Sequence, residues 1–232
     1  MISDGNPLQS GVMSIHSACS ARLVLLLSIA LLLTSGAASA QQVATGAADW
    51  QPLFDGKTLT NWKPTNFGGE GDVKVEDGRI VLYSGGGDLT GITWTGPALP
   101  NTNYELAFQG MRVEGNDFFA GVTFPVADSF CSLILGGWGG TVVGLSSIDG
   151  EDASENATTQ VISFERGRWY DVRLRVTPAR ITVWLEGKQI IDQDIAGKKI
   201  STRVEVEPSQ PLGFASWRTK GAVRDIRLRR LP

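Results

Sequence analysis

The chain has 232 residues, of which 42% are hydrophobic and 19% are charged, and its formal net charge is −3. With 28 glycines and 7 tryptophans, this composition predicts a turn-rich globular domain and excludes a disordered chain, a coiled coil and a nucleic-acid binder. The chain contains one histidine, His16, and two cysteines, Cys19 and Cys131. A histidine-bearing catalytic triad, a histidine metal cage and a cysteine zinc site therefore lack the residues that they need.

An apolar run of eleven residues, LVLLLSIALLL at 23–33, follows Arg22 and precedes the small residues Ala38-Ser39-Ala40. The run is too short to span a bilayer core about 30 Å thick. It is typical of a secretory signal peptide that is cleaved after a small residue. We therefore expect a signal peptide at 1–40, a short linker at 41–49 and a single domain at 50–232.

The mature protein is expected to be exported to the periplasm or beyond the cell, with no membrane anchor and no nucleic-acid partner. Cleavage after Ala40 removes His16 and Cys19, so the exported domain contains no histidine and a single cysteine. That cysteine, Cys131, has no partner for an intramolecular disulfide, and we expect it to be a small buried hydrophobic residue.

Almost every segment after residue 50 alternates apolar and polar residues and is interrupted by Gly, Asp or Asn, which is typical of strands and turns. The predicted strands lie at 73–75, 79–83, 104–113, 118–126, 129–135, 169–176, 181–185, 189–192, 212–217 and 223–231. Turns are expected at 76–78 and 186–188, where a glycine supplies the positive φ of a tight hairpin. The absence of a βαβ rhythm predicts an all-β, antiparallel two-sheet sandwich or jelly roll.

Four segments carry a resemblance to a known family: WQPLFDGKTLTNW at 50–62, GRWYDVRLRV at 167–176, ITVWLEGKQIID at 181–192 and PLGFASWRTKGAVRDIRLRRL at 211–231. They resemble the 3-keto-disaccharide hydrolase domain. The resemblance implies a concanavalin-like or laminin-G-like jelly roll, exported by bacteria, that acts on glycosides oxidised at C3. No histidine-dependent role carries over. The aromatic residues Trp50, Phe54 and Trp62 of the first segment are expected to pack in the core or seal its edge.

The segment 136–159 (GGWGGTVVGLSSIDGEDASENATT) is the one that strand packing explains least. Glycines surround Trp138, and an acidic run follows that contains Asp149, Glu151, Asp152, Glu155 and Asn156. Three interpretations remain open: a solvated acidic loop, a calcium-type site built from hard oxygen ligands, and a sugar-facing site in which Trp138 stacks on a ring.

Arg112 lies on an otherwise apolar strand. If it faces inward, it needs a carboxylate partner such as Glu114, Asp117 or one of the acidic run. If it lies at a sheet edge, its guanidinium reaches solvent.

For a 3-keto-glycoside, the chemistry implied by the resemblance needs a base at C2, a cation on the enolate oxygen and an acid at the leaving oxygen. The catalytic candidates are Asp149, Asp152, Glu155, Asp117 and Arg112. The substrate-binding candidates are Trp138, Asn116, Glu151, Asn156 and Trp217. No cofactor or metal-ligand set is predicted, although a divalent cation is an alternative to Arg112 at the enolate.

The expected partner is an oligosaccharide or a 3-keto-glycoside. Two alternatives to an enzyme stay open. A carbohydrate-binding module of the same fold needs the aromatic platform but no base, and an interaction domain of an exported assembly needs neither.

Overall fold

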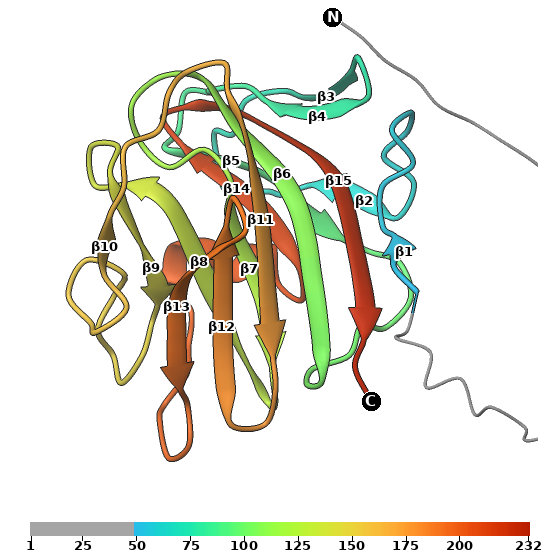
Figure 1. Ribbon diagram of the computed structural model, residues 1–232. Coiled ribbons are helices and arrows are strands. Elements are labelled where there is room, and N and C mark those ends of the chain that lie inside the picture. Colours follow the sequence, from blue (N-terminus) through green and yellow to red (C-terminus); the bar gives the residue numbers. More distant parts are fainter. Residues whose placement is uncertain (1–48) are drawn as a thin grey trace, which may run out of the picture. The chain divides into compact units, whose positions relative to one another are not determined.

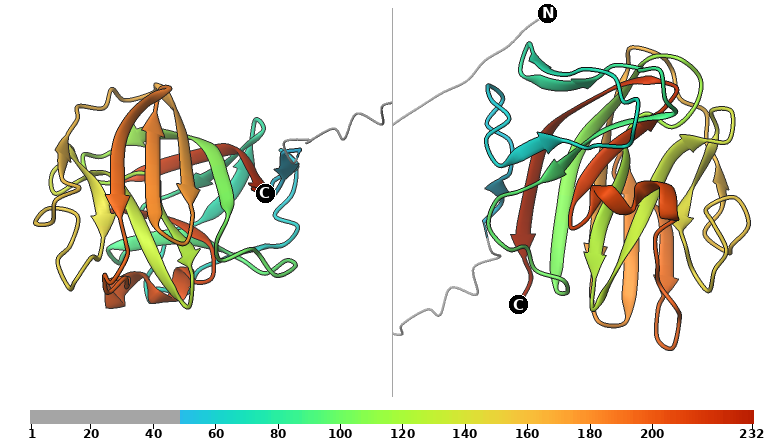
Figure 2. Two further views of the ribbon diagram at one scale, coloured as in Figure 1. Left: turned by 60° about the horizontal axis from the view of Figure 1, so that its bottom comes forward. Right: turned by 180° about the vertical axis from the view of Figure 1, so that it is seen from behind.

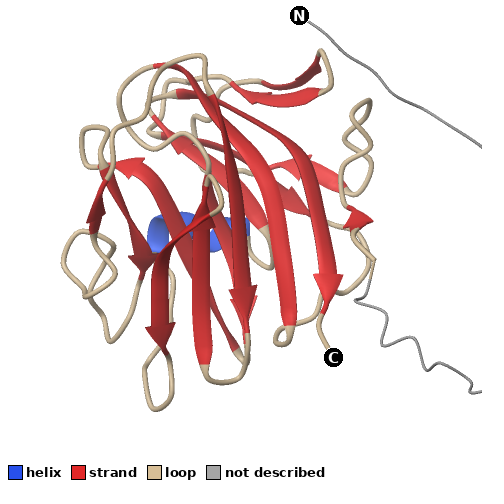
Figure 3. Ribbon diagram, in the orientation of Figure 1, coloured by secondary structure: helices blue, strands red, loops and turns tan. Residues whose placement is uncertain are grey.

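The computed structural model describes residues 49–232, which fold into two stacked antiparallel sheets (Figure 1). Within this range the chain forms one helical segment, the 3₁₀ helix η1 (Val204–Ser209), drawn in blue in Figure 3. None of the described residues forms a helix that is long and apolar enough to cross a membrane. The predicted signal peptide and nearly all of the predicted linker lie outside the described residues.

The first sheet has eight strands. Its order is β13 (Lys188–Asp194), β12 (Arg180–Leu185), β11 (Trp169–Val176), β6 (Tyr104–Glu114), β15 (Lys220–Arg230), β4 (Arg79–Leu82) and β3 (Val73–Glu76), with β1 (Gln51–Pro52) also paired to β15. The second sheet has seven strands. Its order is β10 (Gln160–Val161), β9 (Val142–Ser146), β8 (Ser129–Gly137), β7 (Gly121–Val126), β14 (Gly213–Trp217), β5 (Leu89–Trp94) and β2 (Trp62–Pro64).

The two hairpins that the turn residues predict are confirmed. β3 and β4 pair across Asp77 and Gly78, which have φ values of 47° and 77°. β12 and β13 pair across Glu186 and Gly187, with φ values of 51° and 76°. These left-handed values match the primed turns that suit the twist of a two-stranded ribbon.

The main core lies between the two sheets. In β11 the alternate side chains from Tyr170 to Val176 are buried, as the sequence pattern predicts. Phe108 of β6 meets Phe214 of β14 edge to face at 4.8 Å between ring centroids, so the two sheets are joined by aromatic packing. Cys131 is completely buried, which confirms its expected role as a small core residue.

The aromatic residues near the start of the domain are also part of this packing. Phe54 and Trp62 are buried. The ring of Trp62 lies 5.1 Å from that of Trp94 in an edge-on arrangement, and its indole nitrogen donates to the carbonyl of Leu53 at 2.8 Å. Trp50 is half-buried, beneath the guanidinium of Arg229.

A second, smaller apolar cluster covers the outer face of the second sheet. Side chains from loops and from η1 pack on this face, and Figure 2 (right) shows η1 lying across it. The strands admit these segments because they carry glycines. A Cβ at Gly213 would lie 2.6 Å from the carbonyl oxygen of Ser209, and one at Gly121 would lie 3.1 Å from the ring of Phe118. Glycine in these strands therefore permits a third layer, and the candidate site lies within it.

Candidate functional site

A cavity of about 260 Å³ opens on the outer face of the second sheet. Its floor is formed by Leu89 of β5, Ser132 and Ile134 of β8, and Ser146 of β9. These residues alternate along their strands with core residues such as Leu133, so the strand periodicity itself directs them away from the core. Its walls and rim come from loops, from η1 and from the end of β14, and they include Asp117, Phe118, Trp138, Arg203, Glu205, Val206 and Trp217. A pocket lined by apolar side chains and a few polar groups is the usual composition of a small-ligand site.

Two tryptophans line this cavity, and both are among the residues that the sequence singles out. Trp217 ends β14, is half-buried, and packs 6.3 Å from the ring of Phe118. Trp138 lies in the connection from β8 to β9 and is 46% exposed. Its φ of 49° is unusual for a bulky residue and costs roughly 1–3 kcal/mol. An exposed aromatic ring held in a strained backbone conformation points to a contact with a ligand.

Asp117 lines the cavity and also holds the turn that carries Trp138. Its Oδ2 accepts a hydrogen bond from the backbone N–H of Gly139 at 3.1 Å, and its Oδ1 accepts one from that of Phe118 at 2.8 Å. Its own backbone N–H donates to Thr219 Oγ1 at 3.0 Å. Asn116, the preceding residue, is exposed and does not line the cavity.

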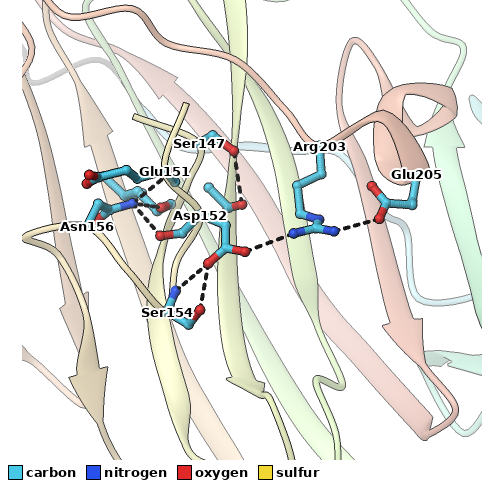
Figure 4. Close-up of polar contacts among 9 residues, drawn as sticks. Ser147, Glu151, Asp152, Ser154, Asn156, Arg203 and Glu205 are labelled. Carbon is cyan, nitrogen blue, oxygen red and sulfur yellow. Dashed lines mark hydrogen bonds and ion pairs between the residues drawn. The ribbon is translucent and has the colours of Figure 1, made fainter. Parts of the chain in front are cut away.

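Two charged residues of the cavity wall, Arg203 and Glu205, are not among the candidates that the sequence provides. Arg203 donates to Glu205 Oε1 at 2.7 Å through one Nη and to Asp152 Oδ2 at 2.8 Å through the other (Figure 4). Asp152 Oδ1 accepts two more hydrogen bonds, from the backbone N–H and the hydroxyl of Ser154. Arg203 and Glu205 line the cavity, whereas Asp152 lies behind Arg203 and does not.

The hydrogen bond from Arg203 lowers the pKa of Glu205. The hydrogen bond to Glu205 raises the pKa of Arg203, and the charge of Asp152 acts in the same direction. Both side chains are therefore charged at neutral pH, which gives the wall a fixed carboxylate and a fixed guanidinium within one ion-pair network.

The other carboxylates of the acidic run lie away from the cavity. Asp149 forms an exposed ion pair with Lys198 at 2.8 Å, and the hydrogen bond from Lys198 lowers the pKa of Asp149. Glu151 and Glu155 are exposed and do not line the cavity. The structure thus brings one member of the run, Asp152, to the back of the cavity wall and leaves the others at the surface.

Asn156 is buried and braces the loop from inside. Its side-chain nitrogen donates to the carbonyls of Leu145 at 2.7 Å and Asp152 at 2.8 Å. Its side-chain oxygen accepts hydrogen bonds from the backbone N–H and the hydroxyl of Thr158 at 2.9 and 2.6 Å. The side-chain amide of Asn156 thus makes its hydrogen bonds to groups of the loop itself and of strand β9.

Arg112 takes neither of the two positions that the sequence suggests. It is only 5% exposed, so it does not reach solvent, and the described residues supply it with no ion-pair partner. Four backbone carbonyls accept its hydrogen bonds instead, from Asp117, Phe164, Gly136 and Gly140. Burial lowers its pKa.

Residues 49–232 contain no group of three or more His, Cys, Asp or Glu side chains placed to hold a metal ion. What the arrangement offers is two tryptophan faces, two carboxylates (Asp117 and Glu205) and one guanidinium (Arg203) around a floor of two aliphatic side chains and two serines. Such a set can stack on a sugar ring, accept a proton and stabilise a developing negative charge.

Comparison with protein families gives one match, to a 3-keto-alpha-glucoside-1,2-lyase-like domain, over residues 49–229. The chain belongs to this family. The match includes every residue that lines the cavity and confirms the resemblance that the four sequence segments carry. A search among curated proteins finds no match.

Solved structures confirm the jelly-roll fold. A Crh5 transglycosylase in complex with NAG has a TM-score of 0.56 at 13% identity, over 80% of this chain and 86% of that one. A Bacillus subtilis protein with a galectin-like fold has a TM-score of 0.55 at 10% identity, over 80% of this chain and 96% of that one. The family match and these structures agree that the chain is a jelly-roll domain of the 3-keto-alpha-glucoside-1,2-lyase-like family.

Proposed function

We propose that the protein cleaves 3-keto-glycosides in the cavity on the outer face of the second sheet. The observation that carries the proposal is that the cavity combines two tryptophans, Trp138 and Trp217, with the Arg203–Glu205 pair, within a domain of the 3-keto-glucoside lyase-like family. The tryptophans suit the apolar face of a sugar ring, and the pair supplies opposite charges at the ring edge.

The reaction needs a base at C2, a cation at the enolate oxygen and a proton for the leaving oxygen. A ketone at C3 acidifies the C2 hydrogen, so a base can remove that proton while the electron pair moves into an enolate. The enolate then expels the oxygen at C1, which takes up a proton, and an enone remains. Addition of water across the enone would complete a net hydrolysis.

Glu205 and Asp117 are the carboxylates of the cavity wall, and Arg203 is its cation. We assign Glu205 as the base, because its second oxygen has no hydrogen-bond partner among the described residues, whereas both oxygens of Asp117 accept backbone N–H groups. We assign Arg203 to the enolate oxygen, because a guanidinium aimed at developing negative charge lowers the barrier of such a step. The proton that Glu205 removes from C2 is then available for the leaving oxygen, so the elimination balances without a second proton donor.

A carbohydrate-binding module is the second candidate. The observation that favours it is the pairing of Glu205 with Arg203, which lowers the pKa of Glu205 and makes it a weaker base. A binding module would use the same tryptophans and the same polar rim, but it would turn over no substrate.

The deciding experiment measures product formation and binding side by side for trehalose, maltose, cellobiose and their 3-keto forms, with EDTA and with added divalent cations. The enzyme proposal expects turnover of a 3-keto form and a loss of at least about a hundredfold in Glu205→Gln, the scale of a missing general base. The matched control is Glu165→Gln, which changes an exposed carboxylate that pairs with Arg168. Binding of disaccharides without turnover would favour the binding module, and absence of both would favour an interaction domain.

The same experiment tests the acidic run. If Asp149→Asn and Glu155→Gln retain turnover while Glu205→Gln loses it, the base belongs to the cavity wall. The opposite pattern would restore the assignment made from the sequence alone.

We also propose that the domain is exported, on the strength of the apolar run at 23–33 and the small residues that follow it. Expression of the whole chain in a bacterium, followed by N-terminal sequencing of the secreted fraction, should give a protein that begins at Gln41. Retention of an intact amino terminus in the cytoplasm would contradict the proposal.

A further inference from the structure

Arg112 is a buried guanidinium with an unusual set of partners. Burial of a charge is costly unless hydrogen bonds replace the lost water, and carboxylates are the usual partners. Here four backbone carbonyls accept from Arg112 at 2.9–3.3 Å, and the ring of Phe119 lies 5.1 Å from its guanidinium carbon. The planar fork of arginine can reach several carbonyls at once, which lysine cannot do.

Two of these carbonyls bracket the exposed tryptophan of the cavity. Gly136 lies two residues before Trp138 and Gly140 lies two residues after it, and one nitrogen of Arg112, Nη2, donates to both, at 3.1 and 2.9 Å. Both glycines have positive φ, 76° and 120°. A Cβ at Gly136 would overlap that same Nη2. The glycines beside Trp138 thus allow the turn to lie directly on the guanidinium.

The turn is held on its other side by Asp117. The carboxylate of Asp117 accepts a hydrogen bond from the backbone N–H of Gly139. The backbone carbonyl of Asp117 accepts one from Arg112 Nε at 3.2 Å. Arg112 therefore holds two carbonyls of the turn directly. It also holds Asp117, which in turn binds the backbone N–H of Gly139 in the same turn. A bulky residue keeps a φ of 49° only when its surroundings determine the backbone in this way.

We propose that Arg112 is a positioning residue, which holds Trp138 and Asp117 in the geometry that the sugar site needs without touching the sugar itself. This inference rests on the proposed function for the role of Trp138, but the placement of the indole can be tested without any ligand. Burial is the main cause of the lowered pKa of Arg112, and the charge of Asp117 opposes it.

The first test is the indole N–H signal of Trp138 in a two-dimensional ¹H–¹⁵N spectrum of the protein, assigned by its loss in Trp138→Phe. In Arg112→Lys we expect that signal to shift or broaden, while the signal of Trp62, assigned in the same way, stays in place. The Trp62 ring packs in the main core, away from the turn. An unchanged Trp138 signal in a folded Arg112→Lys protein would overturn the proposal.

A second variant serves if Arg112→Lys does not fold. Gly136→Ala displaces Nη2 without removing the charge, and Gly139→Ala is its matched control, since it has a similar φ of 87° but no atom within 4 Å of the added Cβ. We expect Gly136→Ala to move the Trp138 signal much more than Gly139→Ala. Equal effects would mean that strain in the turn, and not the contact with Arg112, determines the indole position, which would refute the proposal.

The third test joins positioning to binding. Using the disaccharide bound most tightly by the wild-type protein, we expect Arg112→Lys to lower affinity about fivefold to tenfold, the size of one aromatic contact. In the background of Trp138→Ala the same change should have almost no further effect, because the ring that it positions is gone. Additive losses would contradict the inference. If the wild-type protein binds no sugar, the proposed function fails, and the spectra alone decide the role of Arg112.

Discussion

Arg229 Nε donates a hydrogen bond of 2.8 Å to Oε2 of Glu105, a carboxylate that has no exposed surface. The two residues face each other directly across strands β15 and β6. On the other side of β6, Arg173 and Arg175 donate to Oε1 of the same carboxylate at 2.7 and 2.8 Å. Three arginines of the first sheet therefore converge on one buried charge at the centre of its outer face.

Replacement of Glu105 by glutamine should destabilise the fold. The change removes the negative charge that three guanidinium groups share, and we expect it to lower the free energy of unfolding by about 2–3 kcal/mol in urea denaturation at pH 7. Glu165→Gln, which breaks an exposed pair, should change it by less than about 1 kcal/mol. A Glu105→Gln protein as stable as the wild type would show that the three arginines do not need the negative charge of Glu105.

The same carboxylate predicts a pH dependence. Burial acts to raise the pKa of Glu105, but hydrogen bonds from Arg175 and Arg229 and the charge of Arg173 outweigh it, and its pKa is lowered from 4.5. A lowered pKa in the folded state contributes stability that is complete above the unfolded value and is lost as pH falls through the folded value. The stability difference between wild type and Glu105→Gln should thus be constant from pH 7 to about pH 5.5 and shrink below about pH 4.5. A difference that does not change down to pH 3 would contradict this.

The sequence predicts strands whose two faces differ, and it also predicts the fully buried β7 from its apolar run. β11 alternates between buried and partly exposed residues, so its period of two is visible in the sequence. The sequence does not predict β5, because all six of its residues are buried and its sequence, LTGITW, has no regular alternation of apolar and polar residues. η1 was not predicted either, since Val204 to Glu207 alternate as a strand would.

The sequence predicts a site residue where the residue stands out within its own segment of the chain. Trp138 among glycines is such a case, and so is Trp217 at the end of a regular strand. Arg203 and Glu205 belong to a segment without a recognisable motif, and their meaning appears only when Asp152, some fifty residues away in the chain, meets Arg203. The buried position of Arg112 depends in the same way on carbonyls from three other segments.

Asn156→Ala should affect stability more than binding. The amide makes hydrogen bonds to backbone groups inside the loop, including Leu145 O at 2.7 Å and Thr158 N at 2.9 Å, so its loss leaves buried groups without partners. We expect a decrease of about 2–3 kcal/mol in unfolding free energy. The affinity of the folded variant for disaccharides should stay within about twofold of wild type. Lost affinity at unchanged stability would instead make Asn156 a substrate contact.

Trp138→Gly should separate stability from binding. Glycine adopts a φ of 49° without the steric cost that tryptophan pays there, while it adds conformational freedom to the unfolded chain. The two effects oppose each other, and we expect unfolding free energy to stay the same or to rise by up to about 1 kcal/mol. Disaccharide affinity should fall about fivefold to tenfold, measured by calorimetry. A large loss of stability would mean that the indole is a packing residue and not a platform.

Arg203→Gln should raise the pKa of Glu205. The hydrogen bond from Arg203 is the main cause of the lowered pKa of Glu205, and glutamine keeps a donor but removes the charge. A ¹³C titration of the Glu205 carboxyl, assigned with Glu205→Gln, measures this without any substrate. If Glu205 is the base, the acidic limb of the turnover profile should move to higher pH in the same variant, since the active form is the deprotonated one. A carboxyl titration that moves while the limb stays fixed would assign the base to another group, with Asp117 the remaining carboxylate of the cavity wall.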